Sequence, residues 1–559
     1  MRRFISVGLW AGFAAYLLAT TPAGAASSSG AAPTGTEKES AAPAAGDVAV
    51  PGREASPPVE PEPTFEINSF RFEGNTLFAG DRLAELIDDI AGNERTAADV
   101  EKARETVERF YHDQGYPAVL VNVPEQSAES GDIRLQVIES TIGATRITGN
   151  KYFTTAQILD KLPSLAPGSV LFVPGVQEDI GRVNRNPDLK VVPSMAPGKT
   201  PGTVDVDLKA DDLSPFHGSV ELSNRNSPNT KPLRLNGALH YDNLWHREHS
   251  LSAQYQTAPQ DPSQVEVFSG SYALPAPWNW DDTILIYGVS SNSDTAFGEG
   301  FHSLGKGAII GGRYIKRLPP YGSYNHTATL GVDYKNLSQE TRQHGTADIK
   351  IPEYLPFTVA YNGSLPDTHG LTTFNATLAA SFRGVLAATP EDFEAVRYQA
   401  RGNYVIATLG VDRRQQLPAG MGFFLKLDGQ IADQPLVFSE QYAAGGMENV
   451  RGFLESEFTG DSAFHATAEL SAPDLAPKFG LGERFSIVPY LFFDCALLWT
   501  LQPLPGQIPL ADLQGTGFGI RGFLFKDLEF ELDWAFALEE TAVEKRGDSR
   551  GYFKVKYQF

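Results

Sequence analysis

The sequence predicts two small α+β modules of β-α-α-β-β order, followed by an all-β transmembrane barrel of about 16 antiparallel strands. Three observations predict this architecture. A motif at residues 70–78 recurs at residues 145–153, which indicates two copies of one module. Short strands of alternating character then run to the end of the chain. An export signal opens the chain and favours a membrane barrel.

Residues 1–25 are predicted to be a secretory signal peptide. Two arginines precede an apolar run from Phe4 to about Leu18, and Ala23-Gly24-Ala25 forms a small-residue cleavage site. A membrane anchor is the alternative, but the apolar run is short for a helix that spans a bilayer. No run of ~18 apolar residues follows the cleavage site, so no transmembrane helix is expected in the mature chain.

Composition narrows the function classes. The formal net charge of −22 argues against a nucleic-acid partner, because no basic stripe balances it. Cys495 is the only cysteine of the sequence, which excludes an intrachain disulfide and a multi-cysteine zinc site. Residues 26–63 are rich in Ala, Ser, Pro, Gly and Glu and lack apolar periodicity, so we expect a disordered linker there.

The first module is expected over residues 64–140. The stretch "FEINSFRFEGNTLF" is typical of a strand followed by a Gly-Asn turn, and two helical stretches come next. The second helix is expected to begin at Thr96, with Asp99 completing a capping box, and to end at Gly115. The strands "AVLVNV" and "IRLQVIE" complete the module. The apolar face of the second helix consists of Val100, Ala103, Val107 and Phe110.

The second module is expected over residues 141–213. In "TRITGNKYF" the pair Gly149-Asn150 matches Gly74-Asn75 of the first module. Two weaker helical stretches follow, and "LKVVP" and "TVDVDLK" are the closing strands. Exposed sheet edges of such modules are able to add a strand from a partner. The alternative is a pair of scaffolding domains without a ligand.

Residues 214–559 are predicted to form the barrel. At about 20 residues per strand and loop, this length gives about 16 strands. A soluble sandwich would also alternate, but the signal peptide, the length and the distribution of charge favour a barrel that is apolar toward lipid and polar toward the lumen. In "KDLEFELDWAFAL" the apolar face consists of Leu528, Phe530, Leu532, Trp534 and Phe536, and acidic residues lie between them.

The last strand, "GYFKVKYQF", is predicted to turn Tyr557 and Phe559 toward lipid and Lys554 and Lys556 toward the lumen. A terminal Phe on an amphipathic strand resembles the signal by which bacterial barrels are recognised for membrane assembly. This resemblance implies outer-membrane lipid and the barrel assembly machinery as partners, with Tyr557 and Phe559 as the assembly signal.

Residues 65–559 together resemble the two-partner secretion transporters of the haemolysin secretion/activation family, within the superfamily of POTRA-bearing barrels. That family places a V-R-G-F motif at the tip of a loop folded into the barrel lumen, which here is Val450-Arg451-Gly452-Phe453. It places an F-x-D motif on the inner wall of a later strand, which here is Phe492-Phe493-Asp494. A second "RGF" at residues 521–523 is expected to be part of the strand wall.

Physical chemistry favours a pair between the two motifs. A lumen-facing Arg451 is stable if it meets a carboxylate, which arginine binds bidentately. Alternation through "YLFFDCALLW" places Asp494 opposite Phe493, so Asp494 faces the lumen if Phe493 faces lipid. Gly452 permits a tight loop tip, and Phe453 is expected to wedge against the wall.

The resemblance implies a translocation pore in the outer membrane of a Gram-negative bacterium. Its two POTRA-like modules would capture an unfolded exoprotein in the periplasm, and the barrel would conduct it in extended form. The implied cargo is a large β-helical protein similar to haemagglutinins and haemolysins. No cofactor, metal or nucleotide site is expected, so folding outside the cell is the expected driving force. Many family members carry an amino-terminal helix that plugs the pore, and residues 26–63 show no such pattern.

Three other functions remain as alternatives. An assembly factor of the same superfamily inserts other barrels, but usually carries more modules. A barrel enzyme is disfavoured, because G-x-S-x-G and H-E-x-x-H motifs are missing from the sequence. A passive porin does not explain the two modules. The stretch "HREH" at residues 246–249 suggests a metal site, but a solvated hairpin is favoured because no third ligand is evident.

Overall fold

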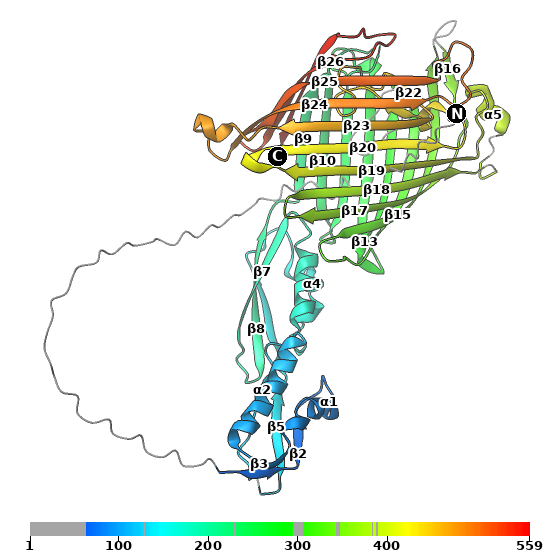
Figure 1. The fold of residues 1–559 in the computed structure, drawn as a ribbon. Helices are drawn as coiled ribbons and strands as arrows, with labels where there is room; N and C mark the ends of the chain where they lie inside the picture. The colour runs from blue at the N-terminus through cyan, green and yellow to red at the C-terminus, as the bar shows by residue number, and fades with distance from the viewer. Residues whose placement is uncertain are drawn as a thin grey trace, which may run out of the picture. The chain divides into compact units, whose positions relative to one another are not determined.

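The computed structural model describes residues 63–127, 129–228, 230–293, 306–341, 347–382, 384–386 and 389–559. The predicted signal peptide (1–25) and the predicted linker (26–63), apart from Pro63, lie outside the described residues. The described chain divides between Leu213 and Ser214 into two compact units. The amino-terminal unit contains both modules, and the carboxyl-terminal unit contains the barrel (Figure 1).

The first module packs its helices and a three-stranded sheet around one core. The central strand β5 lies parallel to β2 and antiparallel to β4. Leu83 and Val107 of the helices and Leu135 of the sheet are fully buried together. The elements are β1 (Phe65–Ile67), β2 (Ser69–Glu73), α1 (Gly80–Glu85), β3 (Gly92–Arg95), α2 (Ala97–Asp113), β4 (Leu120–Asn122) and β5 (Asp132–Ile138).

The predicted first strand of this module is interrupted. Asn68 separates β1 from β2, and β1 pairs with β3 in a separate two-stranded sheet. The sequence of β3, "GNER", has no apolar alternation, so no strand was expected there. The expected capping box is confirmed, because Thr96 and Asp99 make both reciprocal bonds. The backbone N–H of Thr96 holds the pKa of the Asp99 carboxyl below its ordinary value.

The second module repeats the turn of the first. Gly74 and Gly149 have positive φ angles of 86° and 93°, and a Cβ at either would overlap a carbonyl oxygen of a neighbouring strand. Asn75 and Asn150 each donate a side-chain hydrogen bond to the carbonyl three residues later, at 2.9 and 2.8 Å. The repeat therefore preserves a backbone requirement. The elements are β6 (Thr141–Thr148), α3 (Thr155–Leu159), α4 (Val173–Val183), β7 (Leu189–Pro197) and β8 (Thr203–Asp212), with sheet order β6-β8-β7.

The outer edges of β4 and β7 are partly covered by side chains of the preceding helical segments. In β4, the Val121 N–H donates to Glu108 at 3.0 Å, and its carbonyl accepts from Arg104 at 3.4 Å. In β7, the Val191 N–H donates to Asn184 Oδ1 at 2.6 Å, and its carbonyl accepts from Asn184 Nδ2 at 3.0 Å. Each module thus covers part of an edge that the sequence suggested would be open.

The carboxyl-terminal unit is a closed antiparallel barrel (Figure 1). Within the described residues sixteen strands close it, and β9 and β27 form the closing pair, with Tyr557 opposite Val220. A further short strand, β16, extends the pairing at the end of β15. The predicted barrel is therefore confirmed. The strands are β9 (Phe216–Ser223), β10 (Arg234–Leu244), β11 (His249–Thr257), β12 (Glu266–Ala276), β13 (Asn279–Ser291), β14 (Lys306–Arg317), β15 (Asn325–Thr341), β16 (Ala347–Lys350), β17 (Pro356–Asp367), β18 (Gly370–Ser381), β19 (Tyr404–Gln416), β20 (Gly422–Ala432), β23 (Ser462–Ser471), β24 (Phe485–Trp499), β25 (Leu510–Leu524), β26 (Leu528–Ala537) and β27 (Ser549–Gln558).

The barrel strands alternate between an apolar outer face and a polar inner face. In β26, Leu532 and Trp534 are each 48% exposed, whereas Asp533 between them is buried. This arrangement suits strands whose outer side chains contact lipid. No helix in the described part of the chain is long and apolar enough to cross a membrane.

The loop after β18 contains a helix that the sequence did not predict. This helix, α5 (Pro390–Val396), begins with a capping box between Thr389 and Asp392. Phe393 packs edge-on against Tyr354, with ring centroids 5.9 Å apart. Seven residues make about two helical turns, too few to show apolar periodicity in a sequence.

Candidate functional site

The segment between β20 and β23, residues 433–461, folds into the barrel and reaches its inner wall. Two short strands, β21 (Tyr442–Ala444) and β22 (Phe458–Gly460), pair to form its stem. Gly445, Gly446 and Gly452 have φ angles of 103°, 108° and 109°, which favour glycine. We call residues 445–457 the loop tip. The tip carries the predicted motif Val450-Arg451-Gly452-Phe453.

Arg451 and Asp494 meet inside the lumen. Arg451 Nε lies 2.7 Å from Asp494 Oδ2, and Arg451 Nη2 lies 2.9 Å from Asp494 Oδ1. The backbone N–H of Arg451 also donates to Asp494, at 3.2 Å. The arginine side chain is 4% exposed and the aspartate side chain is fully buried. Phe493, the neighbour of Asp494 in β24, is 42% exposed on the outer face.

Two more carboxylates face the same guanidinium. Arg451 Nη1 lies 2.8 Å from Glu469 Oε1 of β23 and 3.5 Å from Asp533 Oδ2 of β26. Arg451 Cζ lies over the ring of Phe492, 3.5 Å from its centroid. The predicted Phe492 and Asp494 therefore contact Arg451 together, from one strand. Removing one partner of such a buried ion pair costs about 3–5 kcal/mol, because a charge is left without compensation.

A second arginine, Arg521 of β25, belongs to the same network. Its Nη1 lies 2.8 Å from Glu469 Oε2, so Glu469 bridges Arg451 and Arg521. Its Cζ lies 4.3 Å from the ring centroid of Tyr490, whose hydroxyl donates to Asp533. The triplet at residues 521–523 lies in the strand wall as predicted. Its arginine also takes part in the ion-pair network of the lumen.

Sequence reasoning missed four members of this network. The signal was present, because their strands alternate and all four lie on the polar face of the wall. The sequence does not show the strand register, which places residues of separate strands at one height around the lumen. The missed members are Glu469, Tyr490, Arg521 and Asp533.

The backbone of the loop tip fits closely against the wall. The Gly452 N–H donates to Tyr552 Oη at 2.8 Å, and the Tyr552 hydroxyl donates to the Phe453 carbonyl at 2.6 Å. Phe453 is fully buried in a cluster with Val450, as expected for a side chain wedged against the wall. A Cβ on Gly515 of β25 would overlap the carbonyl oxygen of Arg451. The position of the loop tip against the wall, which we call its seat, therefore depends on close backbone packing as well as on ion pairs.

Other contacts fix the stem and the far side of the loop tip. Asp461, fully buried, accepts from the Leu436 N–H at 2.8 Å and the Leu501 N–H at 2.6 Å. Arg225, after β9, pairs with Glu455 at 3.1 Å. The loop is thus attached to several parts of the lumen, and Arg451 is the contact that seats its tip on β24.

The predicted assembly residues lie elsewhere. Tyr557 and Phe559 are 48% and 53% exposed on the outer face, at the seam between β9 and β27. The backbone of Phe559 exchanges two hydrogen bonds with Gly218, at 2.9 and 3.0 Å. Their side chains therefore face the side that lipid would occupy, opposite to the inner face that carries the lumen network.

Comparisons with known proteins identify the family of the chain. A family model for POTRA domains of the ShlB type matches residues 65–140. A second model, described as haemolysin secretion/activation protein ShlB/FhaC/HecB, matches residues 202–522, more than half of the chain. POTRA modules joined to a closed barrel define a class of outer-membrane proteins. Within that class, the chain belongs to the haemolysin secretion/activation family.

Individual relatives are distant in sequence. The outer membrane transporter CdiB of Dickeya dadantii (strain 3937) is 25% identical over 421 residues, which cover 73% of this chain and 72% of the relative. The heme/hemopexin transporter protein HuxB of Haemophilus influenzae (strain 86-028NP) is 22% identical over 391 residues, 66% of each chain.

Solved structures show the same fold. CdiB from Escherichia coli superposes with a TM-score of 0.65 at 17% identity, covering 91% of this chain and 93% of that one. BamA from Haemophilus ducreyi lacking POTRA domains 1–3 superposes with a TM-score of 0.52 at 15% identity, covering 89% and 100%. The barrel-assembly alternative is therefore disfavoured, since the family model matches secretion transporters and the BamA likeness is more remote.

The protein is an outer-membrane transporter of the two-partner secretion type, with its POTRA modules in the periplasm. Its barrel conducts a secreted exoprotein. Members of its family are transporters rather than enzymes.

Proposed function

We propose that the loop tip is the gate of this pore, and that it leaves its seat before an extended exoprotein passes. The observation that carries the proposal is the buried bidentate pair between Arg451 and Asp494. The loop lies in the lumen that the cargo must cross, so a seated tip and a passing chain compete for the same space. A charged latch suits this role, because water that enters an opening lumen solvates the separated charges.

The proposed cargo is a large β-helical exoprotein of the haemagglutinin or haemolysin kind. Such a chain crosses unfolded and folds outside, and outside folding makes its passage irreversible. The support is the family membership and the CdiB and HuxB relatives. A neighbouring gene for a large exported protein, and its loss from the medium when this transporter is deleted, would test the assignment.

The gate is tested by tethering it. Val450 and Phe453 of the loop tip share one buried cluster with Ala496 and Leu513 of the wall. Cysteine pairs that join the two sets, in a Cys495→Ala background, should block export when oxidised and restore it when reduced. Each single cysteine variant is the matched control. Normal export through an oxidised, tethered barrel would rule out movement of the loop tip.

We further propose that the modules capture the exoprotein at a sheet edge. Because Glu108 and Arg104 cover Val121, an added strand has to displace them or use another edge. Glu108→Ala should therefore raise the affinity of the full-length transporter for the amino-terminal domain of the exoprotein. Val121→Pro, which removes the N–H, should lower it. If neither variant changes binding while deletion of residues 65–140 abolishes it, capture takes place at a different surface.

Tyr557 and Phe559 are proposed as the assembly signal for the barrel assembly machinery. Removal of Phe559 should lower the amount of folded barrel in the outer membrane, because it deletes the outward-facing end of the closing strand. Heat-modifiable mobility on gels measures this amount. Unchanged levels would contradict the assignment, and Lys556→Gln on the inward face of the same strand is the control.

A further inference from the structure

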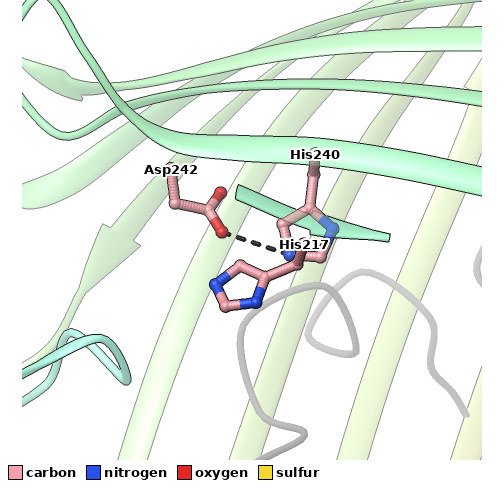
Figure 2. A group of neighbouring side chains, drawn as sticks. All are labelled: His217, His240 and Asp242. Carbon is pink, nitrogen blue, oxygen red and sulfur yellow. Dashed lines mark ion pairs between the residues drawn. The ribbon is translucent and has the colours of Figure 1, made fainter. Parts of the chain in front are cut away.

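Three potential metal ligands lie side by side on the first barrel hairpin (Figure 2). His217 of β9 is directly opposite His240 of β10, and Asp242 follows two residues later on the same face of β10. Leu239 and Tyr241 of β10 point outward and are exposed at 49% and 36%. The three ligands therefore point into the lumen. They lie near the end of the barrel at which β9 begins.

Their donor atoms are already close. One ligand atom from each side chain lies within 4.8 Å of the others. The two imidazole rings are stacked, with centroids 4.9 Å apart, and His240 Nε2 lies 3.2 Å from Asp242 Oδ2. Ligands bound to one zinc ion at about 2.0–2.2 Å lie within about 4 Å of one another. The three side chains are partly exposed, so changes of their rotamers can bring the ligand atoms to that spacing.

A neighbouring strand orients the carboxylate. The Ser250 hydroxyl of β11 donates to Asp242 Oδ1, so Oδ2 is left directed toward the histidines. The Asp242 backbone N–H donates to the Pro215 carbonyl at 2.9 Å, which anchors this point of β10 to the segment just before β9. A hydrogen bond to the second oxygen of a ligating carboxylate is a usual feature of protein metal sites.

We propose that His217, His240 and Asp242 bind one divalent transition-metal ion of the zinc class on the lumen wall. Two imidazoles and one carboxylate are a preferred ligand set for zinc and its neighbours, and water from the lumen completes the coordination. Metal binding uses both imidazoles in the neutral form. Neither family membership nor the transport role requires this site.

A bound ion would join β9 to β10 beside the seam of the barrel. Gly218, the next residue after His217, is the one whose backbone pairs with Phe559 of the closing strand. An ion that binds only the folded barrel raises its stability by mass action. Zinc should therefore raise the temperature at which the barrel loses its compact mobility on gels, and a chelator should lower it again.

The test uses the full-length protein in detergent, purified by a tag without histidine and treated with a chelator. Zinc is titrated in competition with a chromophoric chelator, and cobalt supplies an absorption spectrum that reports the ligand geometry. We expect one saturable site per barrel. His217→Ala, His240→Ala and Asp242→Asn should each weaken binding by more than about tenfold, and Ser250→Ala by about tenfold.

His246→Ala is the matched control, because His246 lies exposed in the turn between β10 and β11, next to the strand that carries His240 and Asp242. It should leave the affinity unchanged. Binding is expressed per heat-modifiable barrel, so a variant that folds poorly still gives a value. The proposal is overturned if the wild type shows no saturable binding, or if the His217→Ala, His240→Ala double variant binds as tightly as His246→Ala.

Discussion

The chain contains the triplet Arg-Gly-Phe twice, and the two copies meet at one carboxylate. Arg451 belongs to the loop tip and Arg521 to the wall strand β25, yet each lies 2.8 Å from an oxygen of Glu469. The Arg451 side chain is 4% exposed and binds a second carboxylate bidentately. The Arg521 side chain is 39% exposed. The same three residues thus make a buried latch in one place and a solvated support in the other.

The glycines of the two triplets explain the difference. Gly452 has a φ of 109°, which turns the chain so that Arg451 and Phe453 both reach the wall. Gly522 lies in an extended strand, where a Cβ would overlap the Ser486 carbonyl. Gly452 bends the backbone and so creates the loop tip. Gly522 leaves room for a carbonyl of the neighbouring strand, and its own strand stays straight. Backbone conformation, and not the triplet itself, determines the role.

The largest effect is expected from Arg451→Ala. The substitution leaves Asp494 buried without its partner, at a cost of about 3–5 kcal/mol to the seated loop. Export of the exoprotein should be abolished or sharply reduced, while the barrel stays in the membrane, because a loop tip that cannot be held at its seat stays loose in the lumen and obstructs the cargo. Exoprotein in the medium, measured against heat-modifiable barrel, reports the outcome. Arg451→Lys, which keeps the charge but loses bidentate geometry, should fall between the variant and wild type. Wild-type export by Arg451→Ala would end the latch hypothesis.

Asp494→Ala should resemble Arg451→Ala, because each removes one half of the same pair. The double variant should export no worse than the poorer single variant, since the shared interaction is lost once. A double-mutant cycle on export provides the measurement. Losses that add fully would mean that the two residues act separately.

Glu469→Gln should have an intermediate effect. It keeps the size of the side chain but removes the charge that both arginines share. The seat of Arg451 retains Asp494, so export should be reduced less than in Asp494→Ala. Combined with Arg521→Ala, it should be no worse than alone. An effect equal to that of Asp494→Ala would make Glu469 the principal partner.

Arg521→Ala should have the smallest effect. Its ion pair is partly exposed, and such pairs contribute about 0–1 kcal/mol. Export should remain close to wild type, and channel conductance in planar bilayers should not change. A loss of export as large as that of Arg451→Ala would show that the two triplets contribute equally to export.

The structure could be predicted best from the sequence where a short stretch of adjacent residues determines the local geometry. The Gly-Asn turns at Gly74 and Gly149 and the capping box at Thr96 could be predicted because a few adjacent residues determine them. The barrel could be predicted because alternation is local. The partners Glu469 and Asp533 could not, because strand register around a closed barrel depends on pairings between distant segments.

A substitution at Gly515 would change the shape of the seat without changing its charge. Because a Cβ there would overlap the Arg451 carbonyl, one added methyl group should unseat the loop while every ion pair partner remains in place. A single nucleotide change converts a glycine codon into an alanine codon. The gate is therefore one mutational step from a constitutively unlatched barrel, and that step lies on a wall strand outside either recognised motif.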